Sequence, residues 1–528
     1  MKKVFTTVID FNLKKTLFLL SLFIFSGMLY ANNVEITGMS YSNTDEVSFD
    51  VSWDNSWRNT GTPGSTENYD GVWIFVKFRD ACAKDSLEPS TYSHMWLDTD
   101  VNAHTVPSNA AIEIGTTNIG GTDRGMGVFI YRDTDGFGTF SVSNITLKWD
   151  QLAQGVSGTD WDIKVFAFEM VYIPEGSFYV GDASSSNYLK DGSTTSPFLI
   201  DSENAITMGT AAGSLNQVGT NLSGTLPANF PKGFDAFWVM KYEITQQQYV
   251  EYLNTLSRTD QNSAVATPVP PGIISIASSD RYVMSRTISP SFRNGIRMPE
   301  TFHPTQPIEF FNDLNYNGIE NEINDGQTIA CNFITNAQMR RFLIWSALRP
   351  MSELEFEKIC RGPESVYGGV ITNELAWSLA GNMPGTFTSV AGVVNSGAPD
   401  ELPNNTGIGL VHNSSNPNGP IRVGATYTSA TDRLEAGSSY YGVADMSGNV
   451  YEFVIRVTSN NSFSGAVYGN GGISWNNPAG WTIHGYRGGA FGFGSSTAHL
   501  PTSSRVYSSG SSIPTTSAGR NTGGRGAR

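Results

Sequence analysis

A polar segment in the middle of the chain has the residue types and spacing of a cation-binding loop. Oxygen-bearing residues alternate with other residues and precede a glycine, as in the front half of a calcium loop: Asp313, Asn315, Asn317 and Gly318. A bidentate Glu is expected at position twelve of such a loop. This chain has Asn324 there, although Glu320 and Glu322 lie nearby. An Asn-Gly turn in a polar loop explains the same residues without an ion and is the simpler interpretation.

Histidine spacing gives no sign of a metal site. No two of the six histidines lie within eight residues of each other: His94, His104, His303, His412, His484 and His499. A His-x-x-x-His run, which places two imidazoles together, is therefore absent. The sequence also has no nucleophile elbow and no phosphate loop. Catalysis of these kinds is not indicated by a local motif.

Cysteine chemistry is limited to three residues, Cys82, Cys331 and Cys360. Exported proteins that depend on disulfides usually carry a larger, even set. We expect at most one bridge, and none is the simpler expectation. Cys360 falls among apolar positions of a predicted helix, so we interpret it as a small core residue rather than a nucleophile.

Composition predicts a folded chain with few helices. Aromatic residues make up 12% of the 528 residues, and 55 residues are glycine. Glycine and small polar residues disfavour helix interiors, whereas the aromatic surface provides a core. Lys and Arg number 33 and Asp and Glu 48, so the net charge is 33 − 48 = −15. This charge disfavours nucleic acid as a partner.

The amino terminus has the pattern of a secretory signal peptide over residues 1–31. Lys14 and Lys15 precede the apolar run 17–25, and Ala31 is suited to be the last residue before cleavage. The run is shorter than a typical membrane span, although an uncleaved anchor is the alternative. No later segment is long and apolar enough to span a membrane. We therefore expect a secreted, periplasmic or cell-envelope protein with no membrane span in the mature chain.

Residues 32–168 have the alternation typical of strands. Val47, Phe49 and Val51 recur at every second position, and the same period is found in 72–78 and 161–167. Short strands separated by Gly, Asn and Asp predict an all-β sandwich, interpreted as an accessory domain. The turn 133–136 is predicted to close a hairpin.

Residues 169–528 have a different character, with a few helices among long loops. Thr245 and Gln248 have the spacing of a capping box, and Ser352 and Glu355 repeat it. After Cys360 the chain is rich in Gly and Asn. This pattern favours an α+β domain with extensive loops.

Six ordered segments of this second part resemble the formylglycine-generating enzyme family, also called the sulfatase-modifying factor domain. They are 170–181, 242–249, 349–362, 441–452, 486–491 and 523–525. The resemblance covers about 360 residues and implies a C-type lectin-like fold with much irregular backbone.

The resemblance also defines what is missing. Family members that oxidise a substrate cysteine to formylglycine hold copper with two late cysteines, because soft thiolates suit Cu(I). Here Phe493 and Ala498 stand near those positions, and no cysteine follows Cys360. Formylglycine-generating activity and copper are therefore not expected. A related branch holds iron with three histidines, for which the spacing here gives no support.

A structural calcium ion is implied by the same resemblance. Carried over, Asp445 and Glu452 offer carboxylates, and Gly448 and Val450 offer main-chain carbonyls. Calcium accepts such oxygen ligands at irregular geometry. The alternative is that Glu452 and Asn449 only hydrogen-bond the loop backbone.

The leading functional hypothesis is an exported, non-catalytic binding or structural protein with an unknown protein or glycan as its ligand. Late aromatic and polar residues form the predicted ligand surface: Trp475, Trp481, Phe493, His499 and Arg505. An enzyme with altered chemistry on the same scaffold and a component of a cell-envelope or adhesion assembly are the alternatives. An open polar pocket around Phe493, His499 and Arg505 would favour the enzyme.

Overall fold

The computed structural model describes residues 34–42, 45–61, 67–82, 89–158, 160–364, 372–378, 386–428, 432–459, 461–472, 480–492, 497–509 and 519–528. The expected signal peptide, Trp475 and Phe493 lie outside these ranges. Within them, no helix combines the length and the apolar character that a membrane span needs.

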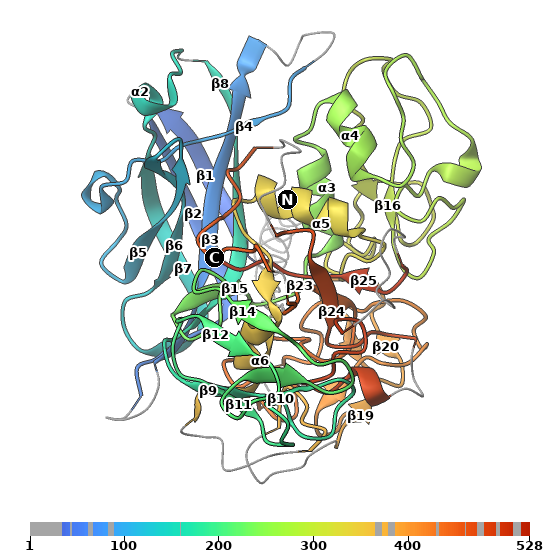
Figure 1. The fold of residues 1–528 in the computed structure, drawn as a ribbon. Coiled ribbons are helices and arrows are strands. Elements are labelled where there is room, and N and C mark those ends of the chain that lie inside the picture. The colour runs from blue at the N-terminus through green and yellow to red at the C-terminus, as the bar shows by residue number, and fades with distance from the viewer. Residues whose placement is uncertain are drawn as a thin grey trace, which may run out of the picture.

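The first part of the chain forms two facing β-layers (Figure 1). One layer contains β1 (Glu35–Ser42), β2 (Glu46–Asn59) and β7 (Gly136–Lys148). The other contains β3 (Asn68–Asp80), β4 (Ser93–His94), β5 (Ala110–Ile119), β6 (Thr122–Arg132) and β8 (Trp161–Ile173). Two short helical segments, η2 (Val101–Ala103) and α2 (Gln151–Gln154), lie in the connections. The alternating apolar residues of β2, β3, β6 and β7 meet between the layers.

The predicted hairpin at 133–136 is wrong. The preceding strand, β6, pairs with β3 and β5, whereas the following strand, β7, pairs with β2. The turn therefore carries the chain from one layer to the other.

Strand β3 is buried on both faces. Val72, Ile74 and Val76 face the opposite layer of the sandwich. Trp73 and Phe75 point the other way and pack into the core of the second part of the chain. The Trp73 Nε1 donates to the carbonyl of residue 346 at 2.9 Å, and the Phe75 ring centroid lies 5.1 Å from that of residue 345. The two parts of the chain thus share a continuous apolar contact.

Strand β8 joins the two parts covalently and by pairing. It pairs with β3 along residues 161–171, and its last residues pair with β15 (Phe237–Met240). Just after β15, the Lys241 Nζ lies 3.0 Å from Asp70 and 2.9 Å from Glu169, with all three side chains buried. This buried ion triad links β3, β8 and the segment after β15. The expected boundary at residue 168 stays a prediction, and β8 runs through it without interruption.

The second part contains small sheets and long connections (Figure 1). Its first strands, which precede β15 in the chain, are β9 (Phe178–Val180), β10 (Leu189–Asp191), β11 (Phe198–Ile200), β12 (Ile206–Met208), β13 (Leu215–Gln217) and β14 (Gly224–Leu226). Two-residue strands follow: β16 (Ile296–Arg297), β17 (Phe311–Asn312), β19 (Thr388–Ser389), β20 (Val393–Val394), β21 (Leu402–Pro403) and β22 (Leu410–Val411). A four-stranded sheet contains β18 (Met351–Ser352), β23 (Tyr451–Ile455), β24 (His484–Arg487) and β25 (Thr522–Gly523).

The helices of this part begin at side-chain caps. They are α3 (Gln246–Leu253), α4 (Arg258–Ala264), α5 (Asn336–Trp345) and α6 (Glu353–Arg361), with 3-10 turns η3 (Ser278–Asp280) and η5 (Thr497–His499). Both predicted capping boxes are confirmed, at Thr245 for α3 and at Ser352 for α6. A third box at Thr335 starts α5, which the sequence analysis did not single out. The chain is rich in strands and has few helices, which agrees with the predicted α+β class.

The three cysteines are free thiols. Cys331 and Cys360 are buried and Cys82 is exposed. The interpretation of Cys360 as a core residue is confirmed, because its side chain packs with the apolar residues of α6. Burial raises the pKa of the Cys331 and Cys360 thiols, so both stay protonated and unreactive at neutral pH.

Candidate functional site

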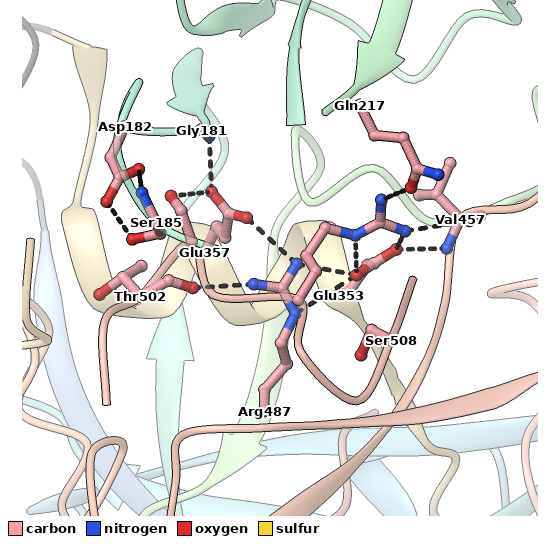
Figure 2. Close-up of polar contacts among 12 residues, drawn as sticks. Gly181, Asp182, Ser185, Gln217, Glu353, Glu357, Val457, Arg487, Thr502 and Ser508 are labelled. Atoms are coloured by element: carbon pink, nitrogen blue, oxygen red, sulfur yellow. Dashed lines mark hydrogen bonds and ion pairs between the residues drawn. The ribbon is translucent and has the colours of Figure 1, made fainter. Parts of the chain in front are cut away.

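The first residue of α6 anchors a buried network of ion pairs (Figure 2). Glu353 Oε2 accepts from Arg487 Nη2 at 2.8 Å and from Arg505 Nε at 2.9 Å. Its Oε1 accepts from Arg505 Nη2 at 2.6 Å and from the Val457 amide at 2.5 Å. Burial would raise the pKa of Glu353, but the two guanidinium groups outweigh burial and hold this pKa below its ordinary value. The carboxylate is therefore ionised and fully used inside the fold.

The second turn of α6 extends this network. Glu357 accepts from the Gly181 amide at 2.8 Å and from Ser503 Oγ at 3.1 Å, and it pairs with Arg487 at 3.2 Å (Figure 2). Arg361 bonds Glu357 and Ser503 as well. The charged residues of two family-like segments, 349–362 and 486–491, thus bind one another and a few main-chain groups. They form a frame rather than a set of free acids and bases.

Arg505 belongs to this frame and not to an exposed surface. Its side chain is fully buried, and besides Glu353 it contacts Gln217 and the carbonyl of Val457. Trp481, another residue of the predicted ligand surface, is also fully buried. In this structure Arg505 forms ion pairs and Trp481 packs in the apolar core.

His499 lies near the place where the family resemblance puts the second thiol. It ends η5 next to Ala498, and its Nδ1 is 2.8 Å from the hydroxyl of Tyr451. Its ring centroid lies 5.2 Å from that of Tyr507, and burial lowers the pKa of the imidazole. The structure therefore places a neutral histidine against two tyrosines here. Phe493, the residue near the first thiol position, lies outside the described residues.

The predicted calcium element is a tight loop before β23. Asp445 and Asn449 have positive φ angles of 59° and 56°, and the Asp445 Oδ2 accepts from the Gly424 amide at 2.7 Å. Glu452 is fully buried, and both of its oxygens accept from Arg525, at 2.7 and 2.8 Å. A guanidinium thus already supplies positive charge to this carboxylate. Calcium at this element stays a prediction, in which the ion has to compete with Arg525.

Glu243 holds the same loop from the other side. Its carboxylate accepts from the Asn449 side chain at 2.6 Å and from the Val450 amide at 3.0 Å. Burial and the negative charges of Asp445 and Glu452 raise the pKa of Glu243 well above its ordinary value. Glu243 lies inside the family-like segment 242–249, but nothing in the sequence indicated this role for it.

Among the described residues, no three His, Cys, Asp or Glu side chains are arranged so that they alone could hold a metal ion.

A groove of about 740 Å³ lies between the sandwich and α3. Ile36 of β1 and Val165 of β8 contribute to its lining, as do Gln248 of α3 and Phe310. Tyr242 also lines it, and the buried hydroxyl of this residue has no hydrogen-bond partner in the described structure. The size and mixed lining are those of small-ligand sites. The groove was not predictable from the sequence, because its walls come from segments far apart in the chain.

Comparison with known families agrees with the motifs. The profile of the sulfatase-modifying factor enzyme 1-like domain matches residues 164–528. The chain belongs to this family. The predicted family membership is therefore confirmed. The buried frame around α6 lies within the matched residues and includes Glu353, Glu357 and Arg487 from the family-like segments.

Other comparisons add little. A search of curated proteins found no match. Among solved structures, Treponema denticola variable protein 1 is similar at 13% identity, over 69% of this chain and 95% of that chain, with a TM-score of 0.26. A likeness at this level carries no argument about fold or function.

Proposed function

We propose that this protein is an exported, non-catalytic binding or structural protein on a sulfatase-modifying-factor scaffold with a C-type lectin-like fold. The observation that carries the proposal is the burial and mutual ion pairing of charged residues around α6. Glu353, Glu357, Arg487 and Arg505 are buried and bound to one another. Together with the lack of any cysteine after Cys360, this supports a protein without the thiol chemistry of the family's enzymes.

The test is direct. Purified protein, with copper added, is incubated with a cysteine-bearing peptide in air, and aldehyde is measured with a hydrazide probe beside an active formylglycine-generating enzyme. We expect no aldehyde above the level of heat-denatured protein. Turnover by the native protein would refute the proposal.

Export and binding need separate tests. The signal pattern at residues 1–31 supports export, and the mature protein should begin at Asn32, which amino-terminal sequencing of secreted material checks. The groove beside α3 supports a binding role, because its volume and its mixed apolar and polar lining are those of small-ligand sites. Ligand candidates are a protein or a glycan. Glycan-array binding that a groove-filling variant, Val165→Trp, abolishes would place the ligand there.

A further inference from the structure

The groove between the sandwich and α3 contains an open strand edge. β8 pairs with β3 along residues 161–171, but on its other side β15 pairs only with residues 170–173. The chain leaves this line after Met240 and enters α3. In the described structure, residues 163–169 therefore have no paired strand on their outer side. Such an edge presents main-chain donors and acceptors to which another extended chain can bind.

The hydrogen bonds next to this edge show which main-chain groups point outwards. The amide of Lys241 donates to the carbonyl of Glu169 at 2.9 Å, so Glu169 directs its main chain away from β3. Val76 of β3 lies opposite Val165, and its carbonyl accepts from the amide of Met95 at 2.9 Å rather than from β8. Both contacts give the odd-numbered residues of β8 the outer edge, because successive residues of a strand direct these groups to opposite sides.

The outward groups belong to Ile163, Val165 and Ala167. Within the described ranges, the main-chain N–H and C=O of these three residues have no hydrogen-bond partner. All three residues line the groove, and Val165 and Ala167 are only half-buried. The edge from 163 to 169 is about 20 Å long at the usual rise of a strand. The floor of the groove is thus a strand edge of useful length that other main-chain groups can reach.

One wall of the groove is apolar. β1, which belongs to the opposite layer of the sandwich, contributes Val34 and Ile36 to the lining. Both side chains pack beside Val165 against the core between the two layers. A side chain that points to this wall from a ligand would meet hydrocarbon.

The other wall is acidic. Glu251 of α3 and the loop residues Glu309 and Glu320 line the groove there. These three carboxylates form no ion pair with another described residue, and Lys164 is the only Lys or Arg of the described structure in the lining. The wall therefore carries an excess of negative charge, which favours a ligand with positive charge.

We propose that the groove binds an extended peptide with basic side chains, which adds to β8 as an antiparallel strand. The inference rests on the proposed binding function and names the ligand class of the same groove. The antiparallel direction continues the line of β15. A glycan has no regular series of amides and carbonyls that could pair with a strand edge, whereas a peptide does.

An antiparallel strand at this edge has a defined arrangement. Its residues opposite 163, 165 and 167 exchange main-chain hydrogen bonds with β8 and share the face of those side chains, towards β1. Its intervening residues turn towards the acidic wall and Glu251. Apolar and basic residues should therefore alternate in a good ligand.

The test uses the mature full-length protein and a fluorescein-labelled peptide of about eight residues in which valine and lysine alternate. Fluorescence anisotropy at pH 7.5 should show saturable binding with a dissociation constant below about 0.1 mM. A peptide with glutamate in place of lysine should bind at least about tenfold more weakly, because its charges face like charges.

Methylation of the peptide nitrogens tests the strand pairing itself. N-methylated valines lose the N–H groups that face β8, so binding should weaken by at least about tenfold, because several hydrogen bonds are lost together. N-methylated lysines lose N–H groups that face away from β8, and binding should be unchanged. The two peptides have the same composition and charge and therefore serve as controls for each other.

Protein variants test the same contacts from the other side. Val165→Pro removes an outward N–H without removing a hydrogen bond of the described fold and should abolish binding. Val165→Ala keeps that N–H, is the matched control and should retain most of the binding. Glu251→Gln should weaken binding about two- to fivefold, whereas Glu300→Gln, outside the groove, should not. If Val165→Pro does not fold, as its unfolding midpoint would show, the methylated peptides decide.

Two results would overturn the inference: no binding of the valine–lysine peptide, or equal effects of the two methylation patterns. The outcome for the proposed function is separate. If the peptide failed and a glycan bound in a manner that Val165→Trp abolishes, the groove would be a glycan site and the proposed binding function would stand. If neither bound, the binding role of the groove would fall together with the inference.

Discussion

The buried carboxylate at the start of α6 provides the sharpest test of the frame. Glu353→Gln keeps the shape and one acceptor oxygen but removes the charge that two buried guanidinium groups share. Arg487 would keep a pair with Glu357 at 3.2 Å, whereas Arg505 would keep only neutral partners. Removing one partner of a buried pair costs about 3–5 kcal/mol. We expect a loss of that size in the free energy of unfolding.

Equilibrium urea unfolding measures this loss as a lower midpoint with an unchanged slope. The matched control is Glu300→Gln, which removes an exposed carboxylate paired with Arg281. Exposed pairs contribute about 0–1 kcal/mol, so this control should unfold almost as the wild type does. If Glu353→Gln lost no more than Glu300→Gln, the α6 network would not hold the fold together and the reasoning above would fail.

Three further perturbations test other buried groups. Burial lowers the pKa of His412 to about 4, so on acidification the unfolded state binds a proton before the folded state does. The free energy of unfolding should therefore fall by about 3 kcal/mol as the pH drops from 6.5 towards 4. In His412→Gln, the free energy of unfolding measured against pH should change less over this range. Lys241→Met leaves two buried carboxylates together and should cost about 3–5 kcal/mol in urea unfolding, with a smaller cost at pH 5 than at pH 8 because the carboxylates then take up protons. In native protein a maleimide should label Cys82 alone, and Cys331 and Cys360 should react only after denaturation, as mass spectrometry will report; native labelling of all three would contradict the buried positions.

Local features of the fold were predictable from the sequence because they depend on neighbours in the chain. The capping boxes at Thr245 and Ser352 need only residues three positions apart, and both form. The alternation in 72–78 correctly marked a strand. Its second buried face was missed, because period-two spacing cannot say what covers Trp73 and Phe75.

The candidate site was harder to predict because its partners are distant. Glu353 and Arg505 are 152 residues apart in sequence, and no spacing rule joins them. Arginine is usually exposed, which made Arg505 a reasonable surface residue until its partners were known.

The two-sided burial of β3 limits how the sandwich can be recombined with other domains. A sandwich whose central strand turns Trp73 and Phe75 towards its neighbour is not an interchangeable module. Recombination that attached it to another scaffold would leave two aromatic rings in water, and a new sandwich placed here would leave the hollow that receives them unfilled. We therefore expect the sandwich and the second part to occur together in related chains.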